Sequence, residues 1–548
     1  MVCGLLTASA MLAVPAKRGW QTKTLTDGTM IEVQLVGDEY YHYWETRAGK
    51  IAIEQKDGRF VIGENVPSPA TLQAKRAKAL ARRQRKDIGV TPNLAPKGVV
   101  ILANFWDCAM DGSHTAAVFD ELCNSTSCTV NQYNDKNYPS AAQYFADQSN
   151  GAYRPVFDVF GPVTLSHDVA HYGTDLFGQQ EGSDSLAADA VVEACILANS
   201  AYTINWADYD SNNDGKIDFV YVIYAGKGQA DGGASYTIWP HNWDIYSARH
   251  YHNCTYTAEQ CVVGGKTINN YACSGELKGT GLCGIGTLCH EFGHVMGLPD
   301  LYDTSYGYVD ENYLTPGKWD IMDGGSYNGG SHCPPNYDPW QKYFFGWLEP
   351  TNLGNTGKNI QIKANGTAGA TTYQINASGM QQTATTPGEC YYLENRQQQG
   401  WDEFVPGTGL LLWKVNFNAT VWSENKPNHS DTEGTPLWTV VSAYPGYIGL
   451  YNTCVEVDGE GYCTKRVTSD FNTFPGSQNV TSWSGVAGKP LLNIEETDGV
   501  ISLTYIEPGA TAIEDVAEEA AARKMVQDGQ MYIIRGETVY TVTGNRIQ

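Results

Sequence analysis

The residues of this sequence whose spacing can do chemistry are His290, Glu291 and His294, which form the pattern His-Glu-x-x-His. On an α-helix, residues four apart lie one above the other, so the two histidines can present their imidazoles to a single ion. Glu291 lies one residue round the helix and can accept a proton from a water at that ion. We expect Zn²⁺, because a catalytic zinc has three protein ligands and keeps a fourth position open for water. A zinc ion lowers the pKa of its water to about 7.

The chain after His294 indicates the third ligand. Gly297 allows the helix to end in a left-handed turn, and Pro299 prevents it from resuming. The chain therefore turns back, and we expect Asp300 to reach the metal. The extended pattern resembles the metzincin zinc signature, with aspartate where most members have a third histidine. Met322 lies about where the Met-turn beneath such a metal is expected.

Other interpretations of this segment stay open. Asp303 and Glu311 are alternative third ligands, although Glu311 would fit a gluzincin pattern only on a second helix, and residues 312–316 have no helical pattern. A helix with two exposed histidines and no metal is also possible. With eleven histidines in the chain, a chance His-Glu-x-x-His has a probability of about one in a hundred. We expect Cys289 to point away from the metal face and to pack.

The length and charge of the chain limit the classes of protein it can be. A chain of 548 residues is too long for one core and suggests about three or four structural units. The hydrophobic fraction of 42% and charged fraction of 18% are ordinary for a soluble protein. The net charge of −24 argues against a nucleic-acid partner, whose phosphates require clustered cations. It suits the binding of cations.

The first sixteen residues are apolar and rich in small side chains, and Lys17-Arg18 follows them. This segment resembles a secretory signal peptide, so we expect a secreted or cell-surface protein; a buried N-terminal strand is the alternative. No other run approaches the 18 apolar residues of a membrane helix, and we expect no transmembrane segment.

The sequence has fourteen cysteines, and secretion would allow some of them to form disulfides. Three pairs are close enough in sequence to close local loops: Cys123/Cys128, Cys254/Cys261 and Cys454/Cys463. The pairing cannot be deduced from the sequence.

Residues 20–65 alternate short strand patterns with turns and predict a small β unit. Residues 71–87 follow with seven cations in a helical or frayed segment, which we interpret as an exposed linker and activation-cleavage site. Residues 17–94 would then be a propeptide that inhibits the enzyme. Because it contains no cysteine, it would need an acidic side chain or its main chain to block the metal centre.

From Pro96 the pattern is α/β, with buried strands at 99–106 and 219–225, an extended segment at 156–165, and helices at 140–147, 184–201 and 338–347. After about residue 350 the chain reads as strands and turns, which favours a β-sandwich. Residues 515–525 predict a short helix or linker, and residues 530–544 a terminal hairpin.

A second possible metal site lies in the polar segment 208–218. Oxygen ligands at alternate positions and a glycine resemble an EF-hand calcium loop through its ninth position. The expected Ca²⁺ ligands are Asp210, Asn212, Asp214, Lys216 and Asp218. The bidentate glutamate at the twelfth position is missing, since Tyr221 stands there. An Asn/Asp-rich turn before a strand is the alternative.

Two further residues are candidates for contact with a substrate. Tyr327, five residues after Met322, can donate a hydrogen bond to a tetrahedral intermediate, although aromatic packing explains it equally well. His241, in Trp239-Pro-His-Asn-Trp243, can line a cleft, although a single histidine is more often structural.

Taken together, these motifs resemble the immune-inhibitor-A family of secreted zinc peptidases, in a form similar to that of Bacteroidetes. The matching segments include 37–39, 210–218, 239–241, 290–303, 319–327, 392–396, 409–411 and 474–476. The resemblance implies a prodomain, a metzincin-like catalytic domain with zinc and structural calcium, and an appended β-domain. Residues 509–548 resemble the carboxy-terminal sorting tails of that phylum.

We therefore predict a multidomain α/β plus β protein. The expected parts are a signal peptide (1–16), a propeptide with a basic linker (17–94), a zinc peptidase domain (95–350), a β-sandwich (351–507) and a linker with a terminal tail (508–548). The expected function is that of a zinc endopeptidase acting on proteins or peptides. The alternative is an adhesin or glycan-binding protein whose metal is structural.

Overall fold

We describe the fold from a computed structural model of the chain. The structure describes residues 9–10, 12–13, 15–16, 19–68, 71–72, 74–75, 84–85, 92–175, 184–279, 281–304, 315–429, 432–443, 453–457, 463–467, 472–476, 479–506, 523–527, 530–535 and 538–541. Among these residues, no helix combines the length and the apolar character that crossing a membrane requires.

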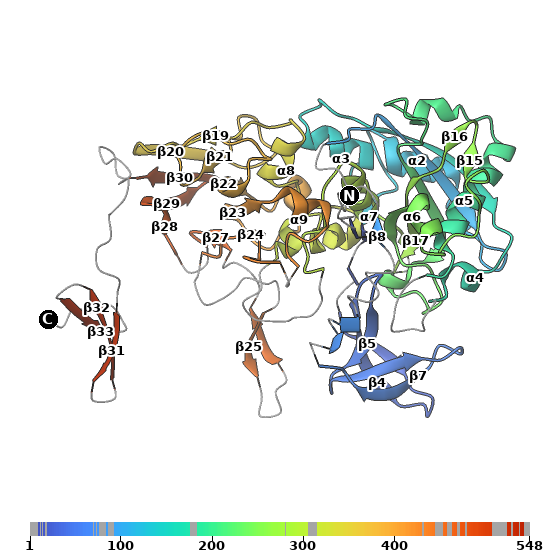
Figure 1. Ribbon diagram of the computed structural model, residues 1–548, viewed down its shortest axis with the longest axis horizontal. Helices are drawn as coiled ribbons and strands as arrows, with labels where there is room; N and C mark the ends of the chain where they lie inside the picture. Colours follow the sequence, from blue (N-terminus) through green and yellow to red (C-terminus); the bar gives the residue numbers. More distant parts are fainter. Residues whose placement is uncertain are drawn as a thin grey trace, which may run out of the picture.

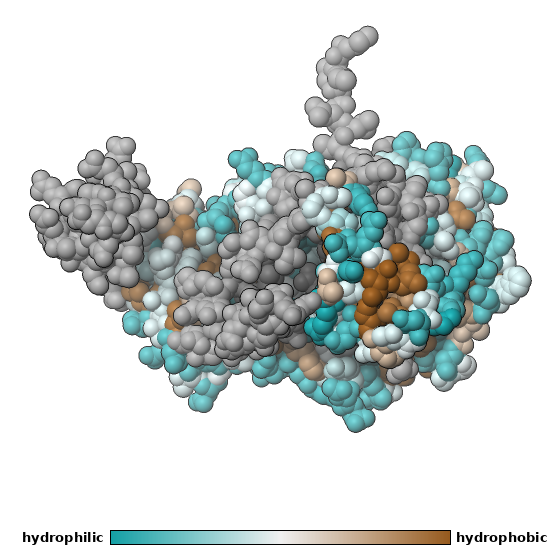
Figure 2. All heavy atoms as spheres, turned by 90° about the horizontal axis from the view of Figure 1, so that it is seen from below, coloured by the Kyte–Doolittle hydropathy of each residue, from teal (hydrophilic) through white to brown (hydrophobic). Residues whose placement is uncertain are grey.

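Five antiparallel strands form the first sheet, in the order β3-β4-β5-β6-β7, which is also their order in the chain. They are Gln21–Thr24, Met30–Gly37, His42–Thr46, Lys50–Glu54 and Phe60–Asn65. Alternate side chains, such as those of Val33 and Leu35, enter a small core. The predicted β unit is present, and it lies beneath the α/β part of the molecule (Figure 1). Figure 2 views the molecule from below; its coloured residues are largely hydrophilic, with a large hydrophobic patch to the right of the centre.

The central sheet carries the candidate site. Its strand order is β12-β9-β13-β17-β14-β2, with β18 beside β17. The strands are Val156–Thr164, Lys97–Asn104, Val220–Lys227, Asn270–Lys278, His241–Asp244, Leu12–Ala13 and Gly281–Leu282. The first four run parallel, whereas β14 and β2 run antiparallel to their neighbours. The near-continuous apolar sequences of β9 and β13 are explained by burial on both faces.

Helices cover both faces of this sheet. On one face, the helix α5 (Ala187–Ala201) packs against alternate residues of β9 and β13, such as Val99 and Val222. On the other face lie α2 (Ala116–Asn124), α3 (Ala141–Gln148) and α7 (Gly286–Val295), against the intervening residues. The helix predicted from Asp184 begins at Ala187 instead. Asp184 lies outside the helix, and its side chain accepts a hydrogen bond from the backbone N–H of Trp239.

The helix predicted at 338–347 is α8, which spans Pro339–Phe344. Asp338 caps it, and Gln341 completes a reciprocal capping box, so the helix begins where the sequence pattern indicated. The remaining short helices are α4 (Val169–Gly173), α6 (Ile245–His250) and α9 (Ala419–Ser423).

Beyond residue 350 two sheets share one apolar core. One contains β19 (Thr351–Asn352), β21 (Tyr373–Ile375), β22 (Gly388–Arg396), β23 (Gly409–Phe417), β24 (Trp438–Val440) and β27 (Thr473–Phe474). The other contains β20 (Lys358–Lys363), β30 (Val500–Tyr505), β29 (Lys489–Thr497) and β28 (Trp483–Val486). We call residues 351–506 the C-terminal β region. Its two packed sheets have the arrangement of a sandwich.

The remaining described strands are two or five residues long and form isolated antiparallel pairs. They are β1 (Ser9–Ala10) with β8 (Gln84–Arg85), β10 (Gln132–Tyr133) with β11 (Lys136–Asn137), β15 (Val262–Val263) with β16 (Lys266–Thr267), and β25 (Thr453–Val457) with β26 (Cys463–Val467).

The end of the chain differs from the prediction. It forms a three-stranded antiparallel sheet, β31 (Arg523–Gln527), β32 (Gln530–Arg535) and β33 (Thr538–Thr541), in place of a two-stranded hairpin. Residues 523–525 were expected in a helix or linker, but they pair with β32. Pairing with a neighbouring strand supplies backbone hydrogen bonds that the local composition does not reveal.

Eleven cysteines lie among the described side chains, and all eleven are free thiols in this structure. They include the first two predicted pairs, Cys123/Cys128 and Cys254/Cys261. The side chains of the third pair, Cys454 and Cys463, lie outside the described part of the chain.

Candidate metal centre

The helix α7 carries the His-Glu-x-x-His pattern and is buried along its whole length. Phe292, on the face opposite the histidines, packs edge-on against Phe145 and Phe157. Gly286 brings the start of the helix against the backbone at Ser326, whose carbonyl oxygen would lie 2.0 Å from a Cβ at residue 286. The helix is therefore fixed both by its aromatic face and by a close backbone contact at its first residue.

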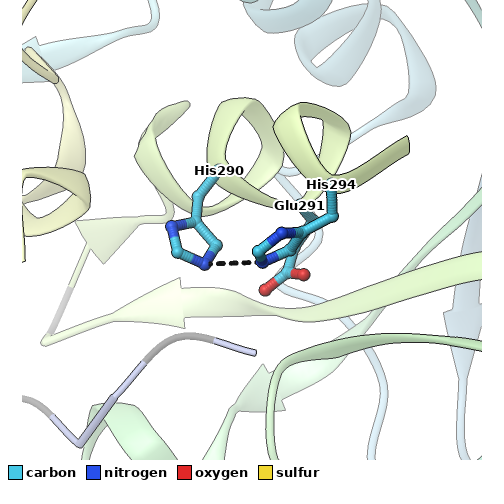
Figure 3. Close-up of side chains that lie close together, drawn as sticks. All are labelled: His290, Glu291 and His294. Carbon is cyan, nitrogen blue, oxygen red and sulfur yellow. Dashed lines mark hydrogen bonds between the residues drawn. The ribbon is translucent and has the colours of Figure 1, made fainter. Parts of the chain in front are cut away.

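Both histidines are oriented by hydrogen bonds from their Nδ1 atoms. His290 Nδ1 donates to the carbonyl of Ile321 at 2.7 Å, and His294 Nδ1 donates to the carbonyl of Leu298 at 2.8 Å. These bonds fix the ring orientations and leave the two Nε2 atoms facing each other, 3.1 Å apart. Figure 3 shows both rings projecting from one side of α7, with the Glu291 carboxylate beside them. With the proton on Nδ1, each ring has an unprotonated Nε2, which is the tautomer that binds a metal through Nε2.

Asp300 reaches the same point from the turn that follows the helix. The helix ends at Val295, and Gly297 has a φ of +105°, a conformation that favours glycine. The Asp300 Oδ1 atom lies 3.3 Å from Nε2 of His290 and 3.3 Å from Nε2 of His294. Three ligand atoms at about 2.0–2.1 Å from a tetrahedral zinc are separated by about 3.3 Å. The three donor atoms therefore have the separations that a zinc ion requires.

The protonation of these side chains is strongly coupled. Burial disfavours the charged form of His290, but the hydrogen bond to Asp300 and the nearby carboxylates raise its pKa to about 9. Burial likewise opposes the charged form of Asp300, yet the two imidazoles lower its pKa to about 2. Burial lowers the pKa of His294. The Asp300 carboxylate is therefore stabilised by positive charge at the point where the two Nε2 atoms meet it.

Glu291 belongs to the same cluster. Its carboxylate and the ligand nitrogens of His290 and His294 lie within 4.8 Å of one another, and all three residues are buried. Met322 lies beneath the helix, because its sulfur would be 2.7 Å from a Cβ at Gly293. Leu301 N also donates to the carbonyl of Met322 at 2.8 Å, which joins the ligand turn to this floor.

The part of the chain that contains this cluster is similar to known proteins. Residues 107–349 match the description "Immune inhibitor A peptidase M6, catalytic domain". The chain is 29% identical to Immune inhibitor A of Bacillus thuringiensis subsp. alesti over 252 residues, which are 42% of this chain and 35% of that protein. It is also 29% identical to Pre-pro-metalloprotease PrtV of Vibrio cholerae over 229 residues, 38% of this chain and 24% of that protein. The aligned parts thus span about a third or less of these relatives.

Residues 107–349 are thus similar to the catalytic domain of the immune inhibitor A peptidases. The metal centre described above lies within it, as does every residue predicted from the sequence to hold zinc. Similarity to metallopeptidases points to a bound metal, and His290, Glu291 and His294 form a cluster among the described residues that could hold one.

Asp303 and Glu311 were the alternative third ligands predicted from the sequence. Asp300 is an aspartate whose carboxylate lies 3.3 Å from the Nε2 atoms of both imidazoles, which favours it as the third ligand. Glu311 lies outside the described residues. Cys289 is buried in the core shared by α7 and the central sheet, as expected for a packing residue.

The two candidate substrate residues have different surroundings. His241 is fully buried, with Nδ1 donating to the carbonyl of Trp239 at 2.6 Å and Nε2 3.0 Å from the hydroxyl of Tyr271. These contacts favour the structural interpretation of this histidine. The hydroxyl of Tyr327 donates to the carbonyl of Pro15 at 2.5 Å. Burial, with Asp231 and Glu291 nearby, raises the pKa of Tyr327, so this hydroxyl keeps its proton.

The carbonyl bound by Tyr327 belongs to a segment on the edge of the central sheet. The strand β2 (Leu12–Ala13) pairs antiparallel with β14, with Ala13 opposite His241, and Ala16 N donates to Gly37 O. β2 also lies within contact distance of α7. Leu12 and Ala13 fall in the predicted signal peptide, and this placement is the one that the alternative of an N-terminal strand predicts. An extended segment therefore lies beside the metal helix.

The predicted calcium loop has an Asx-turn geometry. The Asp210 carboxylate accepts hydrogen bonds from the backbone of Asp214 and Gly215, and Asn212 Oδ1 also accepts from Asp214. Asp214 Oδ1 accepts from the backbone N–H of Lys216, and Asp218 Oδ2 from that of Ser211.

A lysine side chain already lies against this loop. Lys266 Nζ lies 2.6 Å from Asp210 Oδ2, and this hydrogen bond lowers the pKa of Asp210. A Ca²⁺ ion bound through Asp210 would have to displace that ammonium group.

The sequence analysis did not identify Asn425, which contacts the proposed third ligand. Asn425, in the C-terminal β region, forms two hydrogen bonds with Asp300. It lies 125 residues from Asp300 in the sequence, so no local spacing connects the two. Its positive φ of 56° is compatible with asparagine in a turn, but the sequence alone gives no reason to link that turn to a metal ligand.

Proposed function

We propose that this chain is a secreted zinc endopeptidase made as a zymogen, with zinc held by His290, His294 and Asp300. The observation that carries the proposal is the set of three separations, 3.1, 3.3 and 3.3 Å, between the two Nε2 atoms and Asp300 Oδ1. They match the edges of a tetrahedral zinc site, which are about 3.3 Å long. Two nitrogens and one carboxylate oxygen also form a ligand set that zinc accepts.

A zinc ion at this site supplies a Lewis acid and a water whose pKa is about 7. Glu291 then accepts a proton from the attacking water and passes it to the leaving amine. The Nδ1–H groups of His290 and His294 stay bonded to backbone carbonyls, which keeps the rings still during the reaction. The Tyr327 hydroxyl donates to a peptide carbonyl beside the site, as it does to Pro15.

Replacing Glu291 by Gln tests the role of the glutamate. The amide cannot accept the proton of the attacking water, so we expect the rate of peptide hydrolysis to fall about 10²- to 10⁴-fold. The metal content, measured by mass spectrometry of elements on the same sample, should stay that of the unchanged chain, because the three ligands remain. Unchanged turnover of unfolded casein by the Glu291→Gln protein would refute the assignment.

We also propose that the N-terminal part keeps the enzyme latent by its main chain. The strand β2 lies along β14 as an extended substrate would, and the Pro15 carbonyl accepts from Tyr327. The sheet β3–β7 docks this segment, since His42 stacks on Trp239 at 4.6 Å. Removal of a signal peptide after residue 16 would also remove β2. The docked sheet β3–β7 alone would then have to inhibit the enzyme. N-terminal analysis of the secreted protein decides where the chain begins.

Three finer expectations belong to the same proposal. The parts of the chain are a propeptide (17–94), a peptidase domain (95–350), a β-sandwich (351–507) and a terminal tail (508–548). Ca²⁺ binds the loop of Asp210–Asp218 by replacing the ammonium of Lys266. In an oxidising compartment the nearby thiols of Cys254 and Cys261 form a disulfide; the pairing of the other cysteines stays open.

An adhesin or glycan-binding protein with a structural metal is the alternative. The buried Glu291 beside the ligands favours the peptidase, because a purely structural site has no use for a general base. Hydrolysis of unfolded casein that stops on addition of a zinc chelator, and returns on addition of zinc, distinguishes the enzyme from the adhesin.

A further inference from the structure

We infer that Asn425 positions the third metal ligand, Asp300, so that the metal centre is completed by the C-terminal β region. Asn425 lies outside residues 107–349, the part that matches the peptidase domain. The inference rests on the proposed function, because it assigns to Asp300 the role of a zinc ligand.

The amide of Asn425 binds Asp300 at two places. Its Oδ1 accepts from the backbone N–H of Asp300 at 2.6 Å, and its Nδ2 donates to Asp300 Oδ2 at 2.8 Å. One oxygen of the carboxylate is thereby occupied, and the other, Oδ1, faces the two imidazoles at 3.3 Å. Two hydrogen bonds from one planar amide fix both the position and the rotation of the carboxylate.

Asn425 is itself held firmly. Only 1% of its surface is exposed, and its backbone N–H donates to the carbonyl of Trp422 at 3.0 Å. Trp422, on α9, stacks on Trp438 with ring centroids 5.3 Å apart and packs against Phe417. The amide therefore projects from the turn that follows α9, a short helix anchored in an aromatic core.

The contact extends along the turn that carries the ligand. Thr304 Oγ1 donates to the carbonyl of Asn425 at 3.2 Å, and Asn428 Nδ2 donates to the carbonyl of Leu301 at 2.7 Å. The β region thus holds the ligand turn at residues 300, 301 and 304. Within that set, only Asn425 touches the side chain that faces the histidines.

Asparagine is the residue type that this position requires. The backbone N–H of Asp300 needs an acceptor, and the Asp300 carboxylate needs a donor, and a primary amide supplies both. An aspartate at residue 425 would keep the acceptor but place a second carboxylate against Asp300 Oδ2. Asparagine also tolerates the φ of +56° found here.

The test compares zinc affinity in Asn425→Asp and Asn425→Gly with that of the unchanged full-length chain. Asn425→Asp preserves size, and Asn425→Gly removes the amide while accepting a positive φ. We expect both to weaken zinc binding about 10- to 100-fold, the usual effect of removing a residue that orients a ligand. Affinity is measured by competition with a chromogenic zinc chelator, independently of activity. The unfolding temperature of the metal-free proteins is measured in parallel.

Asn418→Ala is the matched control. Asn418 caps α9 through the backbone of Thr420 and Val421 and does not touch Asp300. It should lower the unfolding temperature and leave zinc affinity unchanged.

The outcomes separate the inference from the proposed function. If the unchanged chain binds no zinc, the proposed function fails, and the inference fails with it. If the unchanged chain binds zinc and the Asn425→Asp protein binds it within twofold as tightly, the inference alone is wrong. Loss of folding in both Asn425 variants, with Asn418→Ala still folded, would also overturn it, since Asn425 would then serve the fold and not the ligand.

Discussion

At the scale of single residues, the proposed metal centre depends on hydrogen bonds made by the atoms of the ligand side chains that face away from the proposed metal position. Each histidine uses one nitrogen for a backbone carbonyl, and the aspartate uses one oxygen for an amide. The atoms left over, two Nε2 and one Oδ1, are those that face one another. Such contacts raise the fraction of time that the ligands spend in the binding geometry, which is why their loss lowers affinity.

A different buried histidine gives the protein a dependence on pH. His332 donates from Nδ1 to Asn131 Oδ1 at 2.7 Å, and burial, with Lys278 nearby, lowers its pKa from 6.5 to about 4. The unfolded chain binds this proton more readily than the folded chain. Its contribution to stability is therefore present above about pH 6.5 and is lost as the pH falls towards 4. The shift corresponds to at most about 3 kcal/mol.

Glutamine keeps a hydrogen-bond donor but does not titrate. We therefore expect His332→Gln to reduce the loss of folding stability between pH 7 and pH 4.5. The measurement is the urea midpoint of unfolding at pH 7 and at pH 4.5 for both proteins. The difference between the two midpoints should be smaller for the variant, because the other titrating groups are the same in both. An equal difference in the two proteins would contradict the assignment.

At the scale of elements, the position of α7 is set by close packing at its glycine. A Cβ at Gly286 would lie 2.0 Å from the backbone carbonyl oxygen of Ser326, which belongs to the short helix η4 (Gly324–Ser331). The segment η4 begins two residues after Met322, whose sulfur packs against the middle of α7 at Gly293. The segment below the metal helix therefore supports it at two points.

We expect Gly286→Ala to destabilise the protein by about 1–3 kcal/mol, because backbone atoms must move to admit the methyl group. The shift of α7 should also weaken zinc binding. Gly281→Ala is the control, since a Cβ there has no heavy atom within 4 Å, and its effect should stay within about 0.5 kcal/mol. Thermal unfolding and chelator competition measure the two effects; similar behaviour of the two variants would exclude the packing explanation.

Much of this arrangement could be predicted because it is local or periodic. The helical repeat brings His290 and His294 together, and the turn at Gly297 brings Asp300 back to them. Buried strands such as β9 were predicted from unbroken apolar runs. What could not be predicted depends on contacts between distant segments. Asn425 meets Asp300 only because two sheets pack beside the peptidase domain.

The same limit applies at the two ends of the chain, where strand pairing depends on a distant partner. β31 is a strand because β32 pairs with it, although its neighbourhood is rich in alanine and glutamate. Likewise β2 is defined by its pairing with β14, whereas its apolar sequence resembles a leader. Strand formation at these positions is decided by the partner, which the local sequence does not contain.

At the scale of the whole molecule, the N-terminal sheet is docked by side chains that enter the α/β part of the molecule. Tyr40, on the turn between β4 and β5, has 1% of its surface exposed and belongs to the core formed by α5 and the central sheet. His42 Nε2 lies 2.8 Å from Gln229 Nε2. The contact therefore resembles an internal core more than a surface contact.

We expect Tyr40→Ala to weaken this docking by several kcal/mol, since truncation of a buried aromatic side chain costs about 3–5 kcal/mol. The variant should become active sooner than the unchanged protein on treatment with trypsin, which cuts after Lys and Arg in residues 71–87. The control is Met30→Ala on the same sheet, whose side chain is 60% exposed. The time course of casein hydrolysis after trypsin addition is the measurement. Identical time courses for the Tyr40 and Met30 variants would argue against inhibition by docking.

Under the proposed function, the edge of β14 that β2 occupies has a consequence for the choice of substrates. An edge strand binds a partner through backbone N–H and C=O groups, which every residue carries, so a polypeptide on this edge is recognised by its shape more than by its side chains. Only a stretch with no internal pairing can lie there. Compact globular proteins should therefore resist cleavage until heat, reduction or another protease unfolds them. The first peptide bonds cleaved should lie in flexible loops between their secondary-structure elements.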